Sequence, residues 1–485
     1  MAWGVADVAE RFYGMERDLR LFARELCDVK YWHLLRFSLL NDFIVPKCVQ
    51  FGPAHPDVTA ARTADKPQGK VAGAMSRLCD RIRFDPMFSF GRADVLFALE
   101  PRQAHLSSGE ACSLMLDFFI DQVPSAAVLQ YRPYVKMPPG RRVFRVSVCE
   151  HEEEKCRRAF WRRHAGLTAK EASFIADNVR ETFGIEVDRD LLGGLVCAIL
   201  LRRQVQLRRF RSWLQRLRVK CVVTSVHYNL SNLILAEAAH ALGLPVVELQ
   251  HGTIFPSHAA YNLPVNGSVY SPDYLFAWGD FWEKGLRNYP LKSVVCTGYP
   301  YFDHHLGECP RVAGDGVRRR ILFVSQGTIG AHLAKVAVFL SERLPPDRFS
   351  LRYKLHPSET RTWRSNYPEL ACGRVEVVED TARNIYSCFA ECDVVIGVYS
   401  TSVVEGLAWG LEAFSCRWIP GADGLRAFAD AGLLRYVESE QELLSALRDA
   451  PAGQRSPVDV GRLWVSGAAQ NIVRALHEIV SGGRV

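Results

Sequence analysis

A histidine stands at the end of a predicted buried strand, where it could exchange a proton with a substrate. Residues 245–253 read Pro-Val-Val-Glu-Leu-Gln-His-Gly-Thr, and they follow a helix-like segment over 231–242 that Gly243 closes. A helix, a glycine stop, a short apolar strand and a polar loop are typical of an α/β unit. Ligands of open α/β sheets bind at the carboxyl ends of the strands. His251 is therefore a candidate for acid–base chemistry near neutral pH, although such a residue can also simply hydrogen-bond a turn.

Carboxylates in the same half of the chain could serve as base or nucleophile. Glu100 follows a strand-like run over 94–99, and the helix predicted after it carries Asp117 and Asp121 on one face. Enzymes use carboxylates and imidazoles for proton transfer, and a carboxylate can also form a covalent intermediate. The candidate catalytic residues are His251, Glu248, Asp121 and Glu100.

Three predicted strand ends in the second half of the chain carry groups that suit a phosphate. Residues 325–330 form a short glycine-containing loop that opens a helix, and residues 354–357 place a histidine at a corner that proline makes rigid. Residues 399–406 put consecutive hydroxyls at a helix start, more than a cap needs. Helix N-termini attract anions through unpaired N–H groups and the helix dipole. A carboxylate one turn further on could bind a ribose diol. The candidate ligand-binding residues are Gln326, Gly327, Lys354, His356, Ser400, Thr401, Ser402 and Glu405.

The elements that would position these groups alternate regularly from residue 221 on. Strand-like runs lie at 221–226, 245–249, 274–279, 293–298, 321–325, 351–355, 375–378, 393–397 and 412–416, with helical stretches between them. Alternating strands and helices predict parallel sheets built of βαβ units. We therefore predict an α/β protein with two Rossmann-like domains and a cleft between them. The N-terminal domain spans 1–302, a linker spans 303–318, and the C-terminal domain spans 319–485.

Bulk properties are those of a large globular protein. The chain has 485 residues, a hydrophobic content of 48% and a net charge of +7, so two or three domains are expected. The 14 cysteines form no CxxC pair and no zinc-like spacing with histidine, which indicates reduced thiols. We see no signal peptide, and the longest apolar run, 191–201, is about half a membrane span. We expect a cytoplasmic protein with no nucleic-acid partner. No DxD-like cluster follows a strand, so no metal or other cofactor is expected to be required.

The basic segment over 202–220 admits two interpretations. Its arginines alternate with apolar residues, so it could lie on the anionic inner face of the plasma membrane. It could equally be a surface helix with one face on the core and the other in water, which we favour because solvated charged faces are common. A second basic set could bind an anionic acceptor: Arg102, Arg132, Lys136, Arg141 and Arg142.

Four motifs taken together carry a resemblance to a known family. They are Glu248-x-Gln-His-Gly-Thr253, Gly298-x-Pro300-x-x-Asp303, Lys354-x-His-Pro357 and Ser400-Thr-Ser402-x-x-Glu405-Gly. Over residues 221–420 the chain resembles bacterial surface-polysaccharide glycosyltransferases of the GT-B fold. The His-Pro pair before a Ser/Thr cluster is similar to CMP-Kdo-dependent Kdo transferases, to polysialyltransferases and to CDP-glycerol glycerophosphotransferases. The resemblance implies that His356 and residues 400–402 contact the nucleotide phosphate and that His251 is the base.

The resemblance implies a metal-independent glycosyltransferase that moves Kdo, or a related acidic sugar, from a CMP-activated donor. The acceptor would be a glycan or lipid-linked glycan of lipopolysaccharide O-antigen or capsule, held by the first domain. Alternatives are a CDP-glycerol or polyol phosphotransferase of teichoic-acid type and a non-catalytic assembly subunit with the same fold. A sugar-nucleotide epimerase would share the two-domain architecture.

Overall fold

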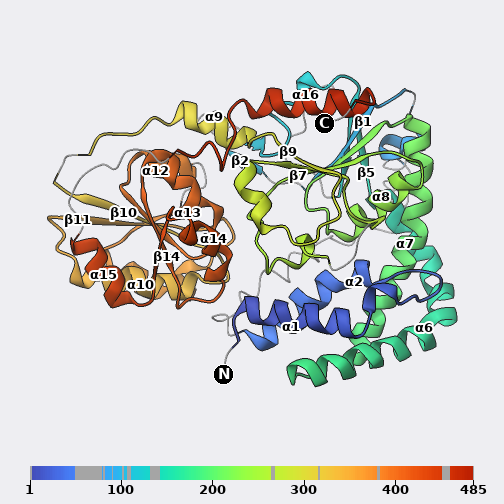
Figure 1. Ribbon diagram of the computed structural model, residues 1–485, viewed down its shortest axis with the longest axis horizontal. Coiled ribbons are helices and arrows are strands. Elements are labelled where there is room, and N and C mark those ends of the chain that lie inside the picture. The colour runs from blue at the N-terminus through green and yellow to red at the C-terminus, as the bar shows by residue number, and fades with distance from the viewer. Residues whose placement is uncertain are drawn as a thin grey trace.

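Two α/β units lie side by side in the computed structural model of the chain (Figure 1). The structure describes residues 3–49, 79, 82–89, 91–100, 103–105, 111–131, 142–263, 268–314, 317–379, 383–449 and 459–483. Each unit is built on a parallel sheet, one of seven strands and one of six. A short antiparallel pair, β2 (Gln103–His105) and β3 (Ala111–Ser113), stands apart from both sheets.

The first sheet has the strand order β5-β4-β1-β6-β7-β8-β9. Its strands are β1 (Val95–Ala98), β4 (Ala126–Gln130), β5 (Arg142–Arg145), β6 (Cys221–Thr224), β7 (Val246–Leu249), β8 (Tyr274–Ala277) and β9 (Ser293–Cys296). All neighbouring strands are parallel. Its central strands are fully buried because both faces are covered, and this explains their continuous apolar runs.

The second sheet has the order β12-β11-β10-β13-β14-β15. Its strands are β10 (Arg319–Val324), β11 (Phe349–Lys354), β12 (Glu376–Val378), β13 (Val394–Gly397), β14 (Glu412–Cys416) and β15 (Arg435–Val437). Counted along the chain this is 3-2-1-4-5-6, the Rossmann order, and the first sheet repeats it with one more strand. The predicted fold class, α/β with two Rossmann-like parallel-sheet domains, is confirmed. The short strand β15 was not predicted.

Helices of the second unit connect its strands, and the last helix follows β15. They are α10 (Gly330–Arg343), α11 (Trp363–Asn366), α12 (Ile385–Ala390), α13 (Thr401–Glu405), α14 (Arg426–Asp430) and α15 (Glu440–Asp449). Apolar residues of α10 and α15 pack on the same sheet face as alternate residues of β11, including Leu351 and Tyr353.

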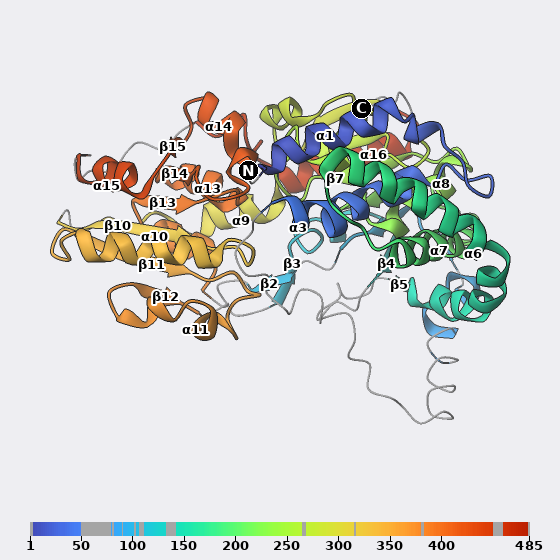
Figure 2. The ribbon, with the colours of Figure 1, turned by 90° about the horizontal axis from the view of Figure 1, so that it is seen from below.

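The N-terminal helices share one core with the helices that cover the first sheet. They are α1 (Val5–Asp18), α2 (Trp32–Ser38), a π-helical turn η2 (Leu39–Ile44) and α3 (Val45–Cys48), and Figure 2 shows α1 and α3 beside α6 and α7. Phe12 and Trp32 pack in the same cluster as residues of α6 (Ser147–Phe183), α7 (Arg189–Leu217) and α8 (Leu230–His240). The N-terminal segment is therefore part of the first domain.

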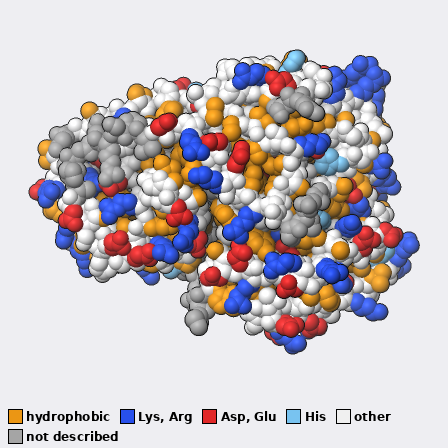
Figure 3. Space-filling view, in the orientation of Figure 1, with side chains coloured by type: hydrophobic (Ala, Val, Ile, Leu, Met, Phe, Trp, Pro, Cys, Tyr) orange, Lys and Arg blue, Asp and Glu red, His pale blue; other side chains and the backbone are white. Residues whose placement is uncertain are grey.

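The basic segment forms the second half of α7, and its arginines are largely paired. Arg209 lies 2.7 Å from Glu152 and Arg202 lies 3.3 Å from Glu153, both on α6. Arg203 pairs with Glu237 of α8. The opposite face of α7 is buried, so the interpretation as a surface helix packed on the core is confirmed. Figure 3 shows Lys and Arg side chains along the margin where α6 and α7 lie. Among the described residues, no helix is both long enough and apolar enough to cross a membrane.

The chain returns to the first domain at its end. Helix α16 (Ala468–Val480) packs Ile472, Leu476 and Ile479 against the first sheet. Gly298 has φ +88°, and a Cβ there would overlap the carbonyl oxygen of Val465. The predicted boundary between linker and first domain stays a prediction, but helix α9 (Pro300–Glu308) occupies the first part of the predicted linker.

The predicted helix carrying Asp117 and Asp121 is wrong. Residues 114–119 form turns, followed by a short 3-10 helix, η4 (Ile120–Gln122). The Asp117 carboxylate accepts a hydrogen bond of 2.9 Å from the Ser113 N–H. Asp side chains that bind nearby backbone N–H groups compete with helix formation, so the helix-like spacing of buried Met115 and Phe119 did not decide the conformation.

Candidate functional site

Glu100 stands where the strand order of the first sheet reverses, between β1 and β6. Its backbone N–H donates to Ser225 Oγ over 3.1 Å, and its carboxylate accepts from the Asn229 side chain. Asn229 also caps α8 by accepting from the Ser231 N–H at 2.9 Å. The crevice at such a reversal is where open α/β sheets bind ligands. The structure therefore places Glu100 at a position suited to chemistry.

Glu248 is the centre of a buried polar cluster at the end of β7. Its side chain is 0% exposed. Oε1 accepts from the Tyr261 hydroxyl at 2.9 Å, and Oε2 lies 2.7 Å from Nδ1 of His227. Burial and the charge of Glu248 raise the pKa of Tyr261 well above its usual range, so Tyr261 stays a donor. A carboxylate enclosed in this way can orient its neighbours but has no exposed surface for a substrate.

His251 lies beside this cluster and is 8% exposed. Its Nδ1 accepts from the Val226 N–H at 3.3 Å and lies 3.7 Å from Glu248 Oε1, while Nε2 is 3.1 Å from the Tyr228 hydroxyl. Because Nδ1 accepts here, a neutral ring carries its proton on Nε2. To take a proton at Nε2, the ring must first carry its proton on Nδ1 instead, and Nδ1 must move within hydrogen-bonding distance of Glu248 Oε1, which lies 3.7 Å away in the structure. Catalytic contacts are often longer without substrate than in the reactive complex.

His227 was missed by the sequence analysis although it carries the same signal as His251. It follows the buried strand β6 by three residues and is itself buried. Its Nε2 lies 2.6 Å from the Tyr289 hydroxyl. His227, Glu248 and Tyr289 thus form a chain of polar groups beneath His251.

The N-terminal helices brace the loop that follows His251. Arg36 makes two hydrogen bonds to the buried Glu16, at 2.6 and 2.9 Å. The same guanidinium donates to the carbonyls of Ala259 and Asn262. A buried Arg–carboxylate pair with such further partners fixes geometry, and here it fixes the loop over 258–262.

Asp121 is placed away from the other acid–base candidates. It is exposed on η4, in the segment that leads into the amino end of β4, whereas Glu100 and Glu248 stand at carboxyl ends of strands. Of the proposed acceptor-binding arginines, Arg142 lies on β5 and donates to the carbonyl of Arg92. Arg102, Arg132, Lys136 and Arg141 lie outside the described residues.

A buried carboxylate that the sequence analysis missed holds the second domain's loops together. Glu359 is 0% exposed. Its Oε1 accepts from Ser325 Oγ at 2.9 Å and from the Tyr367 hydroxyl at 2.7 Å, and its Oε2 accepts from the His356 N–H at 2.7 Å. A Cβ at Gly330 would overlap Glu359 Oε1, so glycine is needed where α10 begins.

His356 stands on this support at the carboxyl end of β11. Its side chain is exposed, and its Nδ1 accepts from the Ser358 N–H at 3.3 Å. Nδ1 also lies 2.8 Å from Ser358 Oγ, so Ser358 fixes the orientation of the ring. Lys354, the last residue of β11, is half-buried, and its carbonyl accepts from the Ser325 N–H at 3.1 Å.

The loops after β10 and β13 meet at the reversal of strand order in the second sheet. The hydroxyls of Thr328 and Tyr399 are hydrogen-bonded to each other. Gln326 and Gly327 lie half-buried in the first of these loops, and a Cβ at Gly327 would approach Ser358 Oγ to 3.0 Å. The structure thus brings the predicted loops 325–330, 354–357 and 399–402 together.

The three hydroxyls at 400–402 have different surroundings. Ser400 Oγ accepts from the Ser402 N–H at 3.2 Å and so caps α13. Thr401 and Ser402 are partly exposed. Glu405 is 4% exposed and hydrogen-bonded to Tyr386 and Thr401, and burial raises its pKa. Its role with a ribose stays a prediction, and its burial counts against that role.

The two candidate regions meet where the domains touch. A Cβ at Gly424 would lie 3.3 Å from Cβ of Tyr399 and 3.6 Å from Cε1 of Phe255. Phe255 belongs to the loop after His251, and Tyr399 to the loop after β13. An apolar cluster continues across the junction and includes Trp282 and Phe428. The loop after His251 and the loop after β13 therefore both lie against Gly424.

Comparison with known proteins assigns no activity. No protein-family model matches the chain, and no curated protein matches its sequence. Among solved structures, UDP-GlcNAc 2-epimerase from Neisseria meningitidis, bound to UDP-GlcNAc, is similar with 13% identity and a TM-score of 0.46 over 80% of this chain and 100% of its own. MurG from Acinetobacter baumannii has 13% identity and a TM-score of 0.43 over 80% of this chain and 99% of its own. A putative UDP-N-acetylglucosamine 2-epimerase from Listeria monocytogenes has 12% identity and a TM-score of 0.45 over 81% of this chain and 98% of its own.

Proposed function

We propose that the chain is a GT-B glycosyltransferase that transfers Kdo, or a related acidic sugar, from a CMP-activated donor to a bacterial surface glycan. The observation that carries the proposal is the convergence of polar strand-end loops at the strand-order reversal of each sheet. The acid–base groups lie in one domain and the anion-binding groups in the other, and a loop from each lies against Gly424. This arrangement suits a transferase, because it could hold a donor and an acceptor in reactive positions at the same time.

The second domain would hold the donor phosphate. His356 would donate from Nε2, and Thr401 and Ser402 present partly exposed hydroxyls. The positive ends of the α10 and α13 dipoles add positive potential. These neutral donors suit a phosphate that gains charge as the sugar leaves, since preorganised donors stabilise developing charge.

The first domain would move the proton. The acceptor hydroxyl loses its proton to His251 Nε2 as its oxygen bonds to the anomeric carbon, and the bond to the CMP phosphate breaks. Glu248 would orient His251 by accepting from Nδ1 after the ring has changed tautomer and the separation of 3.7 Å between Nδ1 and Glu248 Oε1 has shortened. Glu248 is too enclosed to act as a covalent nucleophile, so a retaining reaction would instead have to use Glu100, which is half-buried at the strand-order reversal.

The test is release of CMP from CMP-Kdo in the presence of a lipid-linked glycan acceptor. We expect the wild-type chain to release CMP and transfer sugar, and His251→Ala to lose transfer by at least about 100-fold while still binding CMP, as expected of a general base. His477→Ala is the matched control, because His477 is exposed on α16. Product carrying phosphate from a CDP-polyol donor would instead support the phosphotransferase. Unchanged polymer production in cells with His251→Ala would indicate an assembly subunit.

A further inference from the structure

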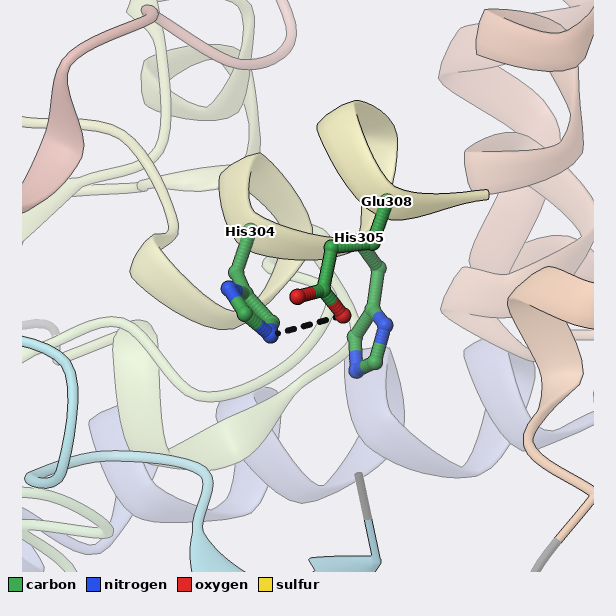
Figure 4. A group of neighbouring side chains, drawn as sticks. All are labelled: His304, His305 and Glu308. Atoms are coloured by element: carbon green, nitrogen blue, oxygen red, sulfur yellow. Dashed lines mark ion pairs between the residues drawn. The ribbon is translucent and has the colours of Figure 1, made fainter. Parts of the chain in front are cut away.

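Three potential metal ligands gather on one helix at the junction of the domains. His304, His305 and Glu308 of α9 offer ligand atoms that all lie within 4.8 Å of one another (Figure 4). His304 Nε2 and Glu308 Oε2 are 3.1 Å apart. Two ligands of a tetrahedral ion with bonds of about 2.1 Å are separated by about 3.4 Å, so these two atoms are already spaced as ligands.

His305 has no role in the protein's own hydrogen bonding. Its side chain is 0% exposed, and among the described residues neither ring nitrogen has a hydrogen-bond partner. The ring packs edge-on to Tyr301 at 4.5 Å and stacks on Tyr386 at 4.8 Å. Buried polar groups are nearly always satisfied, so two unpartnered nitrogens call for an explanation. The ion pair between His304 and Glu308 involves neither nitrogen of His305, so it does not explain why these nitrogens are buried.

We propose that His304, His305 and Glu308 bind one divalent transition-metal ion of the zinc class. Two imidazoles and a carboxylate are a zinc donor set, and water would complete the tetrahedron. The side chains of His304 and Glu308 are 29% and 48% exposed, which gives the ion a path from solvent to the buried third ligand. His–Glu sets of this kind favour zinc, cobalt or nickel over magnesium or calcium, which prefer oxygen ligands.

The site would fix α9 between the domains. The ring of His304 packs on Phe118 of the first domain at 5.0 Å, and that of His305 packs on Tyr386 of the second. Ligands from adjacent turns of one helix, tied to one ion, would hold both rings in place. The ion is therefore assigned a structural role, and the assignment does not depend on the transfer reaction.

The test compares zinc binding by the full chain and by variants, using calorimetry and thermal unfolding with added ZnCl2. We expect one high-affinity equivalent in the wild type and a higher melting temperature. His305→Phe keeps a ring between the two tyrosines, and Glu308→Gln removes the anionic ligand. Each should weaken zinc binding by more than about 100-fold, since even loss of an outer hydrogen bond costs 10–100-fold.

The visible absorption of bound Co²⁺ is a second measurement, and it depends on metal coordination rather than on folding alone. Co²⁺ added to the wild type should give the visible absorption of a tetrahedral site, and His305→Phe should abolish it. His477→Phe controls for loss of a histidine elsewhere. No zinc binding by the wild type, or equal binding by wild type and a folded His305→Phe, would overturn the proposal.

Discussion

Glu359 offers the sharpest test of how the second domain positions its ligand-binding loops. Replacing it by alanine removes a buried carboxylate that accepts three hydrogen bonds, from Ser325, Tyr367 and the His356 N–H. Ser325 keeps a partner, because its hydroxyl also lies 2.9 Å from the Tyr353 hydroxyl. The Tyr367 hydroxyl and the His356 N–H lose the acceptor.

The expected cost follows from those two donors. The Tyr367 bond is buried, so orphaning its hydroxyl should cost about 2 kcal/mol, while the part-buried His356 N–H should cost about 1 kcal/mol. A loss of about 3 kcal/mol in the free energy of unfolding corresponds to a fall in melting temperature on the order of 10 °C for a domain of this size. The His356 loop should lose its fixed position at the same time, which weakens CMP binding.

Glu359→Gln is the matched control. A glutamine can accept from the His356 N–H with its oxygen and donate to the Ser325 and Tyr367 hydroxyls, since hydroxyls both donate and accept. It should cost only about 1 kcal/mol and keep nucleotide binding. The measurement is urea unfolding together with CMP titration for each protein. Equal stability of Glu359→Ala and wild type, or unchanged CMP binding by Glu359→Ala, would refute the reasoning.

Three further predictions concern the junction and the buried titrating groups. Gly298→Ala should release α16 from the first sheet, because the new Cβ would overlap the Val465 carbonyl and residue 298 has φ +88°. A C-terminus that stays intact in limited proteolysis of the variant would contradict this. Burial, with the charge of His227 adding to it, lowers the pKa of His258 from 6.5 to about 4, so its neutral form stabilises the fold above pH 6.5. That contribution should fall by up to about 1.4 kcal/mol per unit as pH drops from 6.5 toward 4, and His258→Phe should flatten the profile measured by urea unfolding. Burial raises the pKa of Glu405, so the protonated carboxyl favours the fold and this advantage is lost as pH rises. The stability of Glu405→Gln relative to wild type should therefore increase with rising pH. A difference in the free energy of unfolding that stays constant with pH would show the reasoning wrong.

The strands and their ends were readable because buried parallel strands leave continuous apolar runs closed by glycine or a polar loop. This signal placed His251 and Ser400 at carboxyl ends of strands, where the structure has them. His356 also follows a strand as predicted, but β11 alternates buried and half-buried residues. His227 gave the same signal but stood in a segment whose strand was read two residues too long, over 221–226 rather than Cys221–Thr224.

The residues that support these groups left no such signal. Glu359 lies within a loop of turns, and its partners Ser325 and Tyr367 come from distant positions, so only the fold brings them together. The helix predicted to carry Asp117 and Asp121 on one face is wrong because the Asp117 side chain accepts from the Ser113 N–H and favours a turn. The group of His304, His305 and Glu308 was missed because residues 303–318 were predicted to be a linker, whereas these three residues lie on α9.

Nucleotide recognition by the second domain is the central claim, and thermal unfolding with CMP, CDP, UDP and GDP at matched concentration tests it most directly. A ligand that binds only the folded chain raises the melting temperature. The account predicts the largest rise with CMP, lost in His356→Ala and kept in His477→Ala. The largest rise with CDP would instead favour the polyol phosphotransferase. A preference for UDP or GDP, or no response to any nucleotide, would contradict the account.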